Sequence, residues 1–218
     1  MESKIYTYSS NEVEVTWDQK RCIHAKECVH GSPDVFDITK KPWINPENLS
    51  SLTNLKKVIM ACPSGALHYK LIDDSELESP ESKNSITIQE NGPLYVRGNI
   101  SVIDAEDNEL INDTRIAFCR CGASKNKPFC DNSHIEANFE SGTDYNPERL
   151  EMEPSETDGG DLKVKLIPNG PFVVEGNYEI SGETQNTKTA KKMSFCRCGA
   201  SSNKPFCDGT HRKVEFTS

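Results

Sequence analysis

Alternating apolar and polar residues predict several short β-strands along the chain. Residues 13–17 (VEVTW) alternate in this way, and related short runs occur at 66–69, 86–88 and 162–166. A brief apolar run at 42–44 (PWI) predicts an edge strand, a position in which proline is tolerated. Each run has the length of one strand in a small sheet.

One segment follows the period of an α-helix instead. Its apolar residues are Leu52, Leu55, Val58, Ile59 and Cys62. Ser50 or Ser51 is available as the N-cap, and Pro63 is expected to end the helix. One further short helix is expected near Arg149. Helix and strand together predict an α+β arrangement for the first part of the chain.

The rest of the chain contains an internal repeat. Residues 91–99 (NGPLYVRGN) recur at 169–177 (NGPFVVEGN), 78 residues later. A cysteine-rich motif starts at Cys119 and recurs at Cys196, 77 residues later. The duplication therefore includes the strands that precede each motif as well as the motif itself.

Each motif places three cysteines and one histidine at the same spacing. The eight residues are Cys119, Cys121, Cys130 and His134 in the first copy and Cys196, Cys198, Cys207 and His211 in the second. Core packing does not produce such a pattern, so we interpret these residues as ligands. Cys130 and His134 are four residues apart and would share one face of a helix. Asp131 and Asp208 are expected to cap the helices at their N termini.

The spacing favours a two-iron cluster at each motif. Two metals that each take a pair of ligands describe a [2Fe-2S] cluster held by three thiolates and one imidazole. A zinc site with three cysteines and one histidine is the alternative. Zinc sites usually have about two to four residues between their first two cysteines, and here there is one.

Both motifs resemble the CDGSH iron–sulfur family, whose pattern is C-x-C-x2-(S/T)-x3-P-x-C-D-G-(S/T)-H. Ser124 and Ser201, with Pro128 and Pro205, fall on further fixed positions of that pattern. The second copy matches throughout, whereas the first has Asn132 in place of glycine. Asparagine adopts left-handed backbone more readily than most residues, so we expect a cluster in both copies.

The resemblance also implies an architecture. Family members with one motif form intertwined dimers, and those with two motifs pack both into one chain. We therefore expect a monomer in which the two repeats form an intramolecular pseudo-dimer. Its two small cluster-binding lobes would face each other about a pseudo-twofold axis and share a β-cap.

A single histidine ligand would make each cluster redox-active and acid-labile. A neutral imidazole in place of a thiolate removes one negative charge, which raises the potential above that of an all-cysteine cluster. Imidazole also takes up a proton near about pH 6.5, and a proton competes with iron. His134 and His211 are thus the weak ligands, and His211→Cys is expected to slow cluster loss at mildly acidic pH.

The three remaining cysteines form a separate candidate site. Cys22 and Cys28 have five residues between them, and Cys62 is followed by proline. Bacterial ferredoxins use C-x2-C-x2-C with a distant C-P for the fourth ligand. Ala25 stands here at the position of the middle cysteine.

This arrangement resembles divergent single-cluster ferredoxins over residues 5–70, and the missing cysteine then implies a [3Fe-4S] centre. A [4Fe-4S] cluster remains open, with His24, water or a thiol as its fourth ligand. A loop histidine such as His24 more often forms only a hydrogen bond. Free buried thiols are the alternative without a cluster.

The composition of the chain disfavours several classes of protein. The 218 residues carry a net charge of −9, which disfavours binding to nucleic acids or acidic membranes. No apolar run approaches the length of a membrane span, and no signal or transit peptide is expected. Nine cysteines in such a chain favour metal over disulfides. We therefore expect a cytoplasmic protein whose partners are redox proteins or apo iron–sulfur proteins.

Basic residues gather around both motifs despite the acidic composition. They are Arg120, Lys125, Lys127, Arg197, Lys204, Arg212 and Lys213. They would screen the anionic clusters, dock an acidic redox partner, or be solvated surface charges.

We predict an α+β protein in five segments. Residues 1–70 form a small ferredoxin-like domain, 71–84 an acidic linker, 85–140 and 161–218 the two repeats of a mostly-β tandem CDGSH unit, and 141–160 an acidic connecting loop. Each segment boundary follows a change in composition or the edge of the repeat.

Three cofactor centres in one small chain predict an electron-transfer protein, with two [2Fe-2S] clusters and one [3Fe-4S] or [4Fe-4S] cluster. The sequence shows neither a nucleophile–base pair nor a phosphate-binding loop, so we do not expect an enzyme. A cluster donor or a redox or pH sensor that uses the histidine-ligated clusters is the second hypothesis. A zinc-bound scaffold protein is the third.

Overall fold

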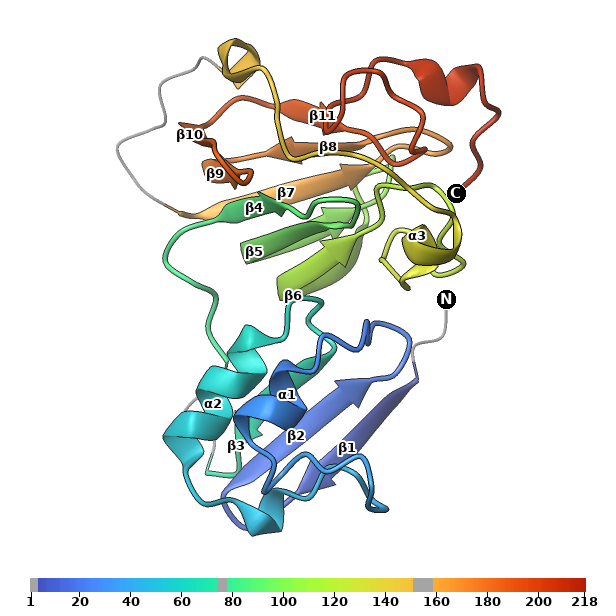
Figure 1. The fold of residues 1–218 in the computed structure, drawn as a ribbon. Coiled ribbons are helices and arrows are strands. Elements are labelled where there is room, and N and C mark those ends of the chain that lie inside the picture. The colour runs from blue at the N-terminus through green and yellow to red at the C-terminus, as the bar shows by residue number, and fades with distance from the viewer. Residues whose placement is uncertain (1–3, 74–77, 151–158) are drawn as a thin grey trace. The chain divides into compact units, whose positions relative to one another are not determined.

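The computed structural model describes residues 4–73, 78–150 and 159–218. The chain divides into two compact units, Met1–Ser79 and Pro80–Ser218. Figure 1 labels the helices and strands of both units. Among the described residues, no helix has the length and apolar character that crossing a bilayer requires.

The amino-terminal unit is built on a three-stranded antiparallel sheet. Its strands are β1 (Ile5–Ser9), β2 (Val13–Asp18) and β3 (Leu67–Leu71), in the order β1-β2-β3. The central strand pairs with both neighbours. The strands predicted at 13–17 and 66–69 are therefore confirmed, and the second begins one residue later than expected.

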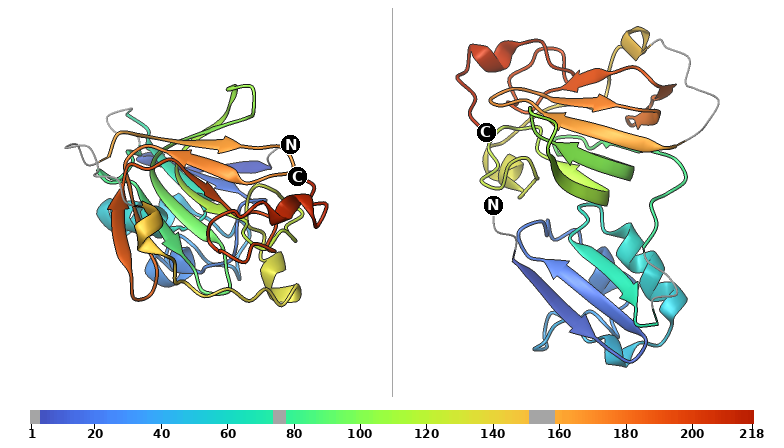
Figure 2. Two further views of the ribbon diagram at one scale, coloured as in Figure 1. Left: turned by 90° about the horizontal axis from the view of Figure 1, so that it is seen from above. Right: turned by 180° about the vertical axis from the view of Figure 1, so that it is seen from behind.

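Two helices cover one face of this sheet (Figures 1 and 2). α1 (Glu27–Gly31) is short, and α2 (Leu52–Ala61) is the predicted helix. Ser51 Oγ accepts a hydrogen bond from Asn54 N, 3.2 Å away, and so caps α2. The core of the unit contains Val13, Val15, Val35, Phe36, Ile44, Leu55, Ile59 and Leu67. Burying an aliphatic side chain of this size contributes about 1.5–3 kcal/mol.

The edge strand expected at 42–44 does not form. Ile44 makes only an isolated antiparallel bridge with Phe36, and the described strands leave Pro42 out. Proline has no N–H group to donate to a ladder, so the bridge is not extended at this position. Ile44 and Phe36 are both buried in the core, which accounts for the apolar run.

The carboxyl-terminal unit contains one eight-stranded sheet (Figure 1). Its strands are β4 (Ser85–Ile88), β5 (Leu94–Ile103), β6 (Glu109–Phe118), β7 (Asp161–Leu166), β8 (Phe172–Glu175), β9 (Tyr178–Ser181), β10 (Asn186–Thr189) and β11 (Met193–Phe195). They follow the order β10-β9-β4-β5-β7-β8-β11, and β6 pairs with β5. The predicted strands at 86–88 and 162–166 are confirmed as β4 and β7. Because the structure has two sheets and few helices, its fold class is mixed α and β, with mostly β-structure.

The two repeats pair with each other reciprocally within this sheet, an arrangement that we call strand exchange. β4 and β7 are the first strands of the two repeats, and each pairs antiparallel with the next strand of its own repeat, β5 or β8. On its other side, β4 pairs in parallel with β9 of the second repeat, and β7 pairs in parallel with β5 of the first. Both repeats therefore contribute to one continuous sheet.

Aromatic side chains connect the core of this unit to the cysteine motifs. The rings of Phe118 and Phe172 stack with their centroids 4.8 Å apart, and those of Phe172 and Phe195 are 5.3 Å apart. The ring of Phe206 lies 5.5 Å from that of Phe195. All four side chains are buried. Phe118 and Phe195 each immediately precede the first cysteine of a motif, so the core fixes where both motifs begin.

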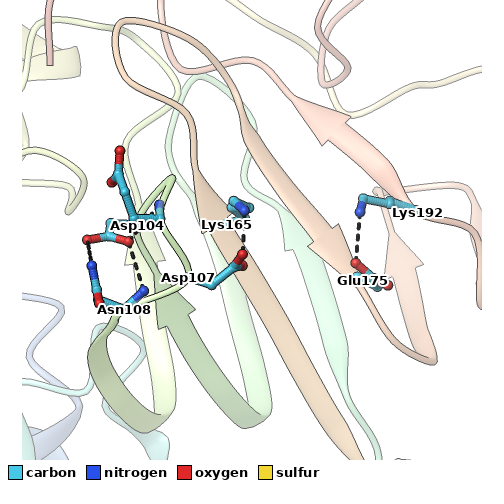
Figure 3. A network of polar contacts seen from close by, with 7 residues as sticks. Asp104, Asp107, Asn108, Lys165, Glu175 and Lys192 are labelled. Carbon is cyan, nitrogen blue, oxygen red and sulfur yellow. Dashed lines mark hydrogen bonds and ion pairs between the residues drawn. The ribbon is translucent and has the colours of Figure 1, made fainter.

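Figure 3 shows a polar network at the turn between β5 and β6. Asp104 closes this turn, because its Oδ1 accepts hydrogen bonds from Glu106 N and Asn108 N, each at 2.9 Å. Lys165 of β7 forms an ion pair with Asp107 of the turn, with Nζ and Oδ1 2.9 Å apart. Exposed ion pairs contribute about 0–1 kcal/mol, so strand pairing carries most of the stability here.

Parts of the two predicted acidic connections lie outside the described residues. The linker expected at 71–84 includes 74–77, and the loop expected at 141–160 includes 151–158. Pro147–Leu150 forms a 3-10 helix, which confirms the second expected short helix. The exact boundaries of the five predicted segments stay predictions.

Candidate metal centres

Each cysteine motif folds back on the last strand of its repeat. In the first motif, Cys119 N donates to Pro128 O at 2.9 Å, and Cys130 N donates to Ala117 O at 2.8 Å. The second motif repeats both hydrogen bonds, at 2.9 and 2.8 Å. These backbone contacts bring the first and third cysteines of a motif to the same end of the strand.

The candidate ligands of the first motif meet in two pairs. Cys119 Sγ and Cys121 Sγ are 3.6 Å apart, and Cys130 Sγ and His134 Nδ1 are 3.4 Å apart. Among the described residues, no group of three or more His, Cys, Asp or Glu side chains is arranged to hold a single metal ion. Paired donors fit a centre with two irons, each bound by one pair.

The second motif repeats the sulfur pair but not the histidine contact. Cys196 Sγ and Cys198 Sγ are 3.6 Å apart. His211 Nδ1 lies 2.9 Å from Asn169 O, and because a carbonyl oxygen only accepts, Nδ1 donates this hydrogen bond. Nδ1 of His211 therefore faces a backbone carbonyl, whereas Nδ1 of His134 faces a sulfur.

The sequence predicted that the cysteine and the histidine of a motif share one face of a helix. This prediction is wrong. α3 (Ser133–Glu136) begins after Cys130, and the second motif has only a 3-10 helix, Thr210–Arg212. Cys130 reaches His134 through a tight turn. The contact between these residues thus comes from turn geometry and not from the helical period.

The prediction of aspartate N-caps is wrong in the cap position, which each aspartate precedes by one residue, but the expected hydrogen bond from the first N–H group of the helix to a carboxylate forms. The N-cap residues are Asn132 and Gly209, with φ of 69° and 86° and no capping side chain. Asp131 instead closes the turn before α3, because its Oδ1 accepts from Ser133 N at 3.0 Å. Asp208 repeats this contact in the second motif at 2.9 Å. Asn132 adopts the left-handed backbone expected of it, so the turn accommodates the departure from glycine.

Backbone N–H groups are directed at the sulfurs. Ala123 N lies 3.4 Å from Cys121 Sγ, and Asn132 N lies 3.5 Å from Cys130 Sγ. Such donors favour a thiolate, whereas burial raises the pKa of Cys130 to about 11 and so disfavours it. A coordinated cation opposes that burial effect and deprotonates the thiol, so buried cysteines of this kind suit ligation.

The two motifs touch through their first turns. A Cβ added to Gly122 would lie 2.6 Å from Cys198 O, and Gly199 approaches the backbone of Cys121 in the same way. Both glycines have positive φ, 79° and 78°. Only glycine fits such an approach. The sequence reasoning did not identify this contact, although the repeated C-R-C-G was an available signal.

Two of the seven basic residues near the motifs are not surface charges. Arg120 is 1% exposed and Arg197 is 5% exposed. Their guanidinium groups donate hydrogen bonds to backbone carbonyls. The interpretation as solvated charge is therefore wrong for these two arginines, whereas Lys125, Arg212 and Lys213 are exposed.

The three amino-terminal cysteines line one cavity. Cys22, Cys28 and Cys62 all contribute to its wall, and its volume is about 640 Å³. Burial raises the pKa of Cys28 to about 11, and the nearby Cys62 and Cys22 thiolates add to the rise. All nine cysteines of the protein have free thiols, so each candidate ligand is available to a metal.

His24 and Ala25 lie in the wall of the same cavity. His24 has a left-handed backbone, with φ 55°, and its Nδ1 lies 3.9 Å from Cys22 Sγ. This distance fits a hydrogen bond to sulfur. The sequence reasoning did not identify the apolar residues of the wall, which include Trp17, Trp43, Ala66 and Leu67.

Family models match both units of the chain. A model described as "Divergent 4Fe-4S mono-cluster" matches residues 8–71. A model described as "Iron-binding zinc finger CDGSH type" matches residues 91–135 and 169–212. The matched ranges contain all the candidate ligands.

Two kinds of curated protein are similar to parts of the chain. "Uncharacterized protein YjdI" of Escherichia coli K12 is 38% identical over 63 residues, which are 29% of this chain and 82% of the relative. "CDGSH iron-sulfur domain-containing protein 1" of Rattus norvegicus is 31% identical over 90 residues, 41% of this chain and 78% of the relative. No solved structure matches the chain. These findings identify an iron–sulfur protein: the chain belongs to the CDGSH iron–sulfur family, with two CDGSH domains that follow a divergent 4Fe-4S mono-cluster domain.

Proposed function

We propose that the chain transfers electrons by means of three iron–sulfur clusters. The proposed ligands of the two [2Fe-2S] clusters are Cys119, Cys121, Cys130 and His134, and Cys196, Cys198, Cys207 and His211. The proposed ligands of a [3Fe-4S] or [4Fe-4S] cluster are Cys22, Cys28 and Cys62. The observation that carries the proposal is the pairing of donors in the first motif, at 3.6 and 3.4 Å.

A bound iron–sulfur cluster supplies reversible one-electron chemistry. The chain supplies the donors that set its charge. Three thiolates and one neutral imidazole leave a site less negative than four thiolates would, which favours the reduced state. Hydrogen bonds from Ala123 N and Asn132 N to sulfur act in the same direction, because they stabilise negative charge on the thiolates.

The strand exchange supports a pseudo-twofold arrangement of two lobes. β4 and β7 have equivalent pairings on both sides, and Gly122 and Gly199 have equivalent contacts with the opposite motif. We infer from this reciprocity a monomer with an intramolecular pseudo-dimer and a shared β-cap. A three-stranded sheet with both helices on one face supports a ferredoxin-like fold for the amino-terminal unit.

The partners we propose are redox proteins or apo iron–sulfur proteins, and the proposed compartment is the cytoplasm. Exposed Lys125, Arg212 and Lys213 adjoin the motifs, so an acidic surface on the partner suits docking there. Free thiols on all nine cysteines suit a reducing compartment. The proposed role is that of a carrier and not of an enzyme.

The test is anaerobic purification of the full chain, with counts of iron and acid-labile sulfide and EPR spectra before and after reduction. The proposal expects about seven or eight irons per chain, according to the type of the amino-terminal cluster. It also expects reversible titration without loss of iron. Colourless protein that contains zinc and neither iron nor sulfide would refute it.

Cluster donation is the second candidate function, and uneven burial of the proposed ligands favours it. Cys119 and Cys196 are 3% and 2% exposed, whereas His134 and His211 are partly exposed. An accepting protein would therefore meet the histidine side of each site first. Incubation of the loaded chain with an apo-ferredoxin under oxidising conditions tests this idea. Transfer of iron and sulfide supports donation, and retention of both through repeated redox cycles supports electron transfer.

A further inference from the structure

Arg120 and Arg197 occupy equivalent positions between the first two cysteines of the two motifs, and both are buried. The residues are 1% and 5% exposed. Moving a cation from water into a protein interior is unfavourable unless an anion or hydrogen bonds compensate for the lost hydration. The neighbours of the two guanidinium groups therefore decide what these charges do.

Neutral acceptors hold the guanidinium group of Arg120. Its Nε donates to Gly92 O at 2.8 Å, and its Nη2 donates to Gln89 O at 2.6 Å. Its Nη1 donates to Ser141 Oγ at 3.2 Å. Arg120 also stacks over Phe139, with its Cζ 5.5 Å from the ring centroid. These contacts fix the group in place but bring no negative charge to it.

Arg197 has a matching set of contacts in the second repeat. Its Nε donates to Gly170 O at 2.8 Å, and its Nη2 donates to Ile167 O and Ser218 Oγ, each at 2.7 Å. Its Cζ lies 5.6 Å from the centroid of the Phe216 ring. The duplication has thus preserved the whole environment of the arginine and not only its position.

Neither arginine has a carboxylate partner among the described residues. All the acceptors given above are carbonyl or hydroxyl oxygens. An arginine guanidinium keeps its proton in a protein, so both side chains are cationic at neutral pH. Two buried positive charges are therefore left for some other anion to balance.

The groups near these charges that become anionic when they bind a metal are cysteine thiols, mainly of the opposite motif. Cys196 of the second motif and Cys121 of its own motif both lie within electrostatic range of Arg120. Cys119 of the first motif lies within electrostatic range of Arg197. The contact between the two glycine turns is consistent with this exchange, because it brings the motifs together at Cys121 and Cys198, the residues that follow the two arginines.

We propose that Arg120 and Arg197 are exchanged counter-charges, each of which stabilises the anionic metal centre of the opposite repeat. The inference rests on the proposed function, because it requires a centre at both motifs. A buried cation stabilises the reduced, more negative state of a neighbouring centre more than the oxidised state, so removal of the cation lowers the potential. Each repeat would then supply the other with a positive charge as well as with a paired strand.

The effect is measurable once the two sites have different spectra. His134→Cys gives the first motif four thiolates, which separates its EPR signal and potential from those of the second. Titration of the full loaded chain with dithionite, followed by EPR, then gives one midpoint potential for each site. Arg120→Gln and Arg197→Gln each remove one buried charge. Lys125→Gln removes an exposed charge of the first motif and is the matched control.

Arg120→Gln is expected to lower the reduced-to-oxidised ratio of the second site at least tenfold at a fixed potential, equal to about 59 mV for one electron. Arg197→Gln is expected to do the same to the first site. Arg120→Lys and Arg197→Lys keep the charge and should remain near the parent. Lys125→Gln should also remain near the parent, because solvent and salt screen an exposed charge.

A shift in midpoint potential that is confined to the substituted repeat would overturn the inference. Equal shifts in the glutamine and lysine variants would overturn it as well. Either result would indicate a local structural role for the arginine. If a glutamine variant fails to load a site, loss at the opposite repeat supports the inference and loss at its own repeat alone contradicts it. A parent protein without iron and sulfide would reject the proposed function itself, before any arginine variant is compared.

Discussion

Asn84 donates a hydrogen bond from Nδ2 to the carbonyl oxygen of Asn177, 2.9 Å away. The same Nδ2 donates to Gly160 O at 3.0 Å, and Asn84 Oδ1 accepts from Asn99 N at 3.1 Å. Asn84 is 2% exposed and immediately precedes β4. One buried amide thus ties the start of the first repeat to the second repeat, where the strands are exchanged.

Asn84→Leu is therefore expected to destabilise the carboxyl-terminal unit by about 2–4 kcal/mol, because it leaves buried backbone groups without hydrogen-bond partners. Urea unfolding of the full chain, followed by far-UV circular dichroism, measures the change. Both tryptophans of the chain lie in the amino-terminal unit. Their fluorescence follows that unit and should not change.

Asn99→Ala is the matched control for this prediction. The Asn99 side chain is exposed, and its Nδ2 donates to Asp161 Oδ1 at 2.7 Å. Water replaces such a contact, so we expect a loss of about 0.5 kcal/mol or less. Equal losses in the two variants would show that burial of Asn84 has no special effect.

The approach of Gly122 to Cys198 predicts that Gly122→Ala empties both proposed [2Fe-2S] sites. The added Cβ would lie 2.6 Å from Cys198 O, and relief of that contact moves the cysteines of both motifs. Alanine at φ 79° adds a further cost of about 1–2 kcal/mol. Iron and acid-labile sulfide per chain measure the result. Loss from one site only would show that the two turns move independently.

Gly209→Asn separates backbone strain from this steric effect. Gly209 has φ 86°, and no atom lies within 4 Å of a Cβ added there. Asn132 adopts φ 69° at the equivalent position of the first motif. We therefore expect Gly209→Asn to keep its full iron content. If Gly209→Asn lost as much iron as Gly122→Ala, a side chain on left-handed backbone would by itself explain the iron loss in both variants.

Asp34 links the loop after α1 to the start of α2. Its Oδ1 accepts from Ser32 Oγ at 2.6 Å, and its Oδ2 accepts from Ser50 Oγ at 2.6 Å and from Ser50 N at 3.0 Å. Burial raises the pKa of Asp34, but these hydrogen bonds outweigh burial and lower the pKa from 3.8 to about 2. The folded state thus favours the ionised carboxylate.

Because the folded pKa of Asp34 is below the unfolded value, the unfolded state binds the proton first as the pH falls. The stabilisation is therefore complete above about pH 4 and is lost between about pH 4 and 2. Asp34→Asn should lower stability at neutral pH by about 1 kcal/mol, since solvent screens part of the effect. It should also flatten the acid dependence, measured by tryptophan fluorescence in urea. Parallel pH profiles of parent and variant would contradict this assignment.

Local periodicity predicted the elements whose packing partners are near in the sequence. The alternation at 13–17 and the helical spacing at 52–62 reflect one buried face, and both elements form. The parallel pairing of β4 with β9 is different, because alternation at 86–88 shows which face is buried but not which strand lies beside it. The resemblance implied a β-cap shared by the two repeats, but which strands pair across it emerges only from the three-dimensional structure.

Residue spacing identified candidate donors better than it identified how they come together. The contact between Cys130 and His134 was predicted on a helix and is made by a turn. Burial of Arg120 was not predicted, because arginine is mostly exposed and its acceptors come from distant segments. Close contacts that depend on the other repeat, such as that of Gly122, are equally invisible to local patterns.

The amino-terminal cavity predicts that Ala25→Cys converts this site to one with four cysteines. Ala25 lines the cavity with the three cysteines and stands at the middle position of C-x2-C-x2-C. A fourth thiolate would retain the iron that a [3Fe-4S] centre lacks, so iron per chain should rise by about one at constant sulfide. His24→Ala is the control, because the 3.9 Å contact of His24 with Cys22 Sγ fits a hydrogen bond, and its iron content should not change. An unchanged iron count in Ala25→Cys, together with loss of one iron in His24→Ala, would instead identify His24 as the fourth ligand of a [4Fe-4S] cluster.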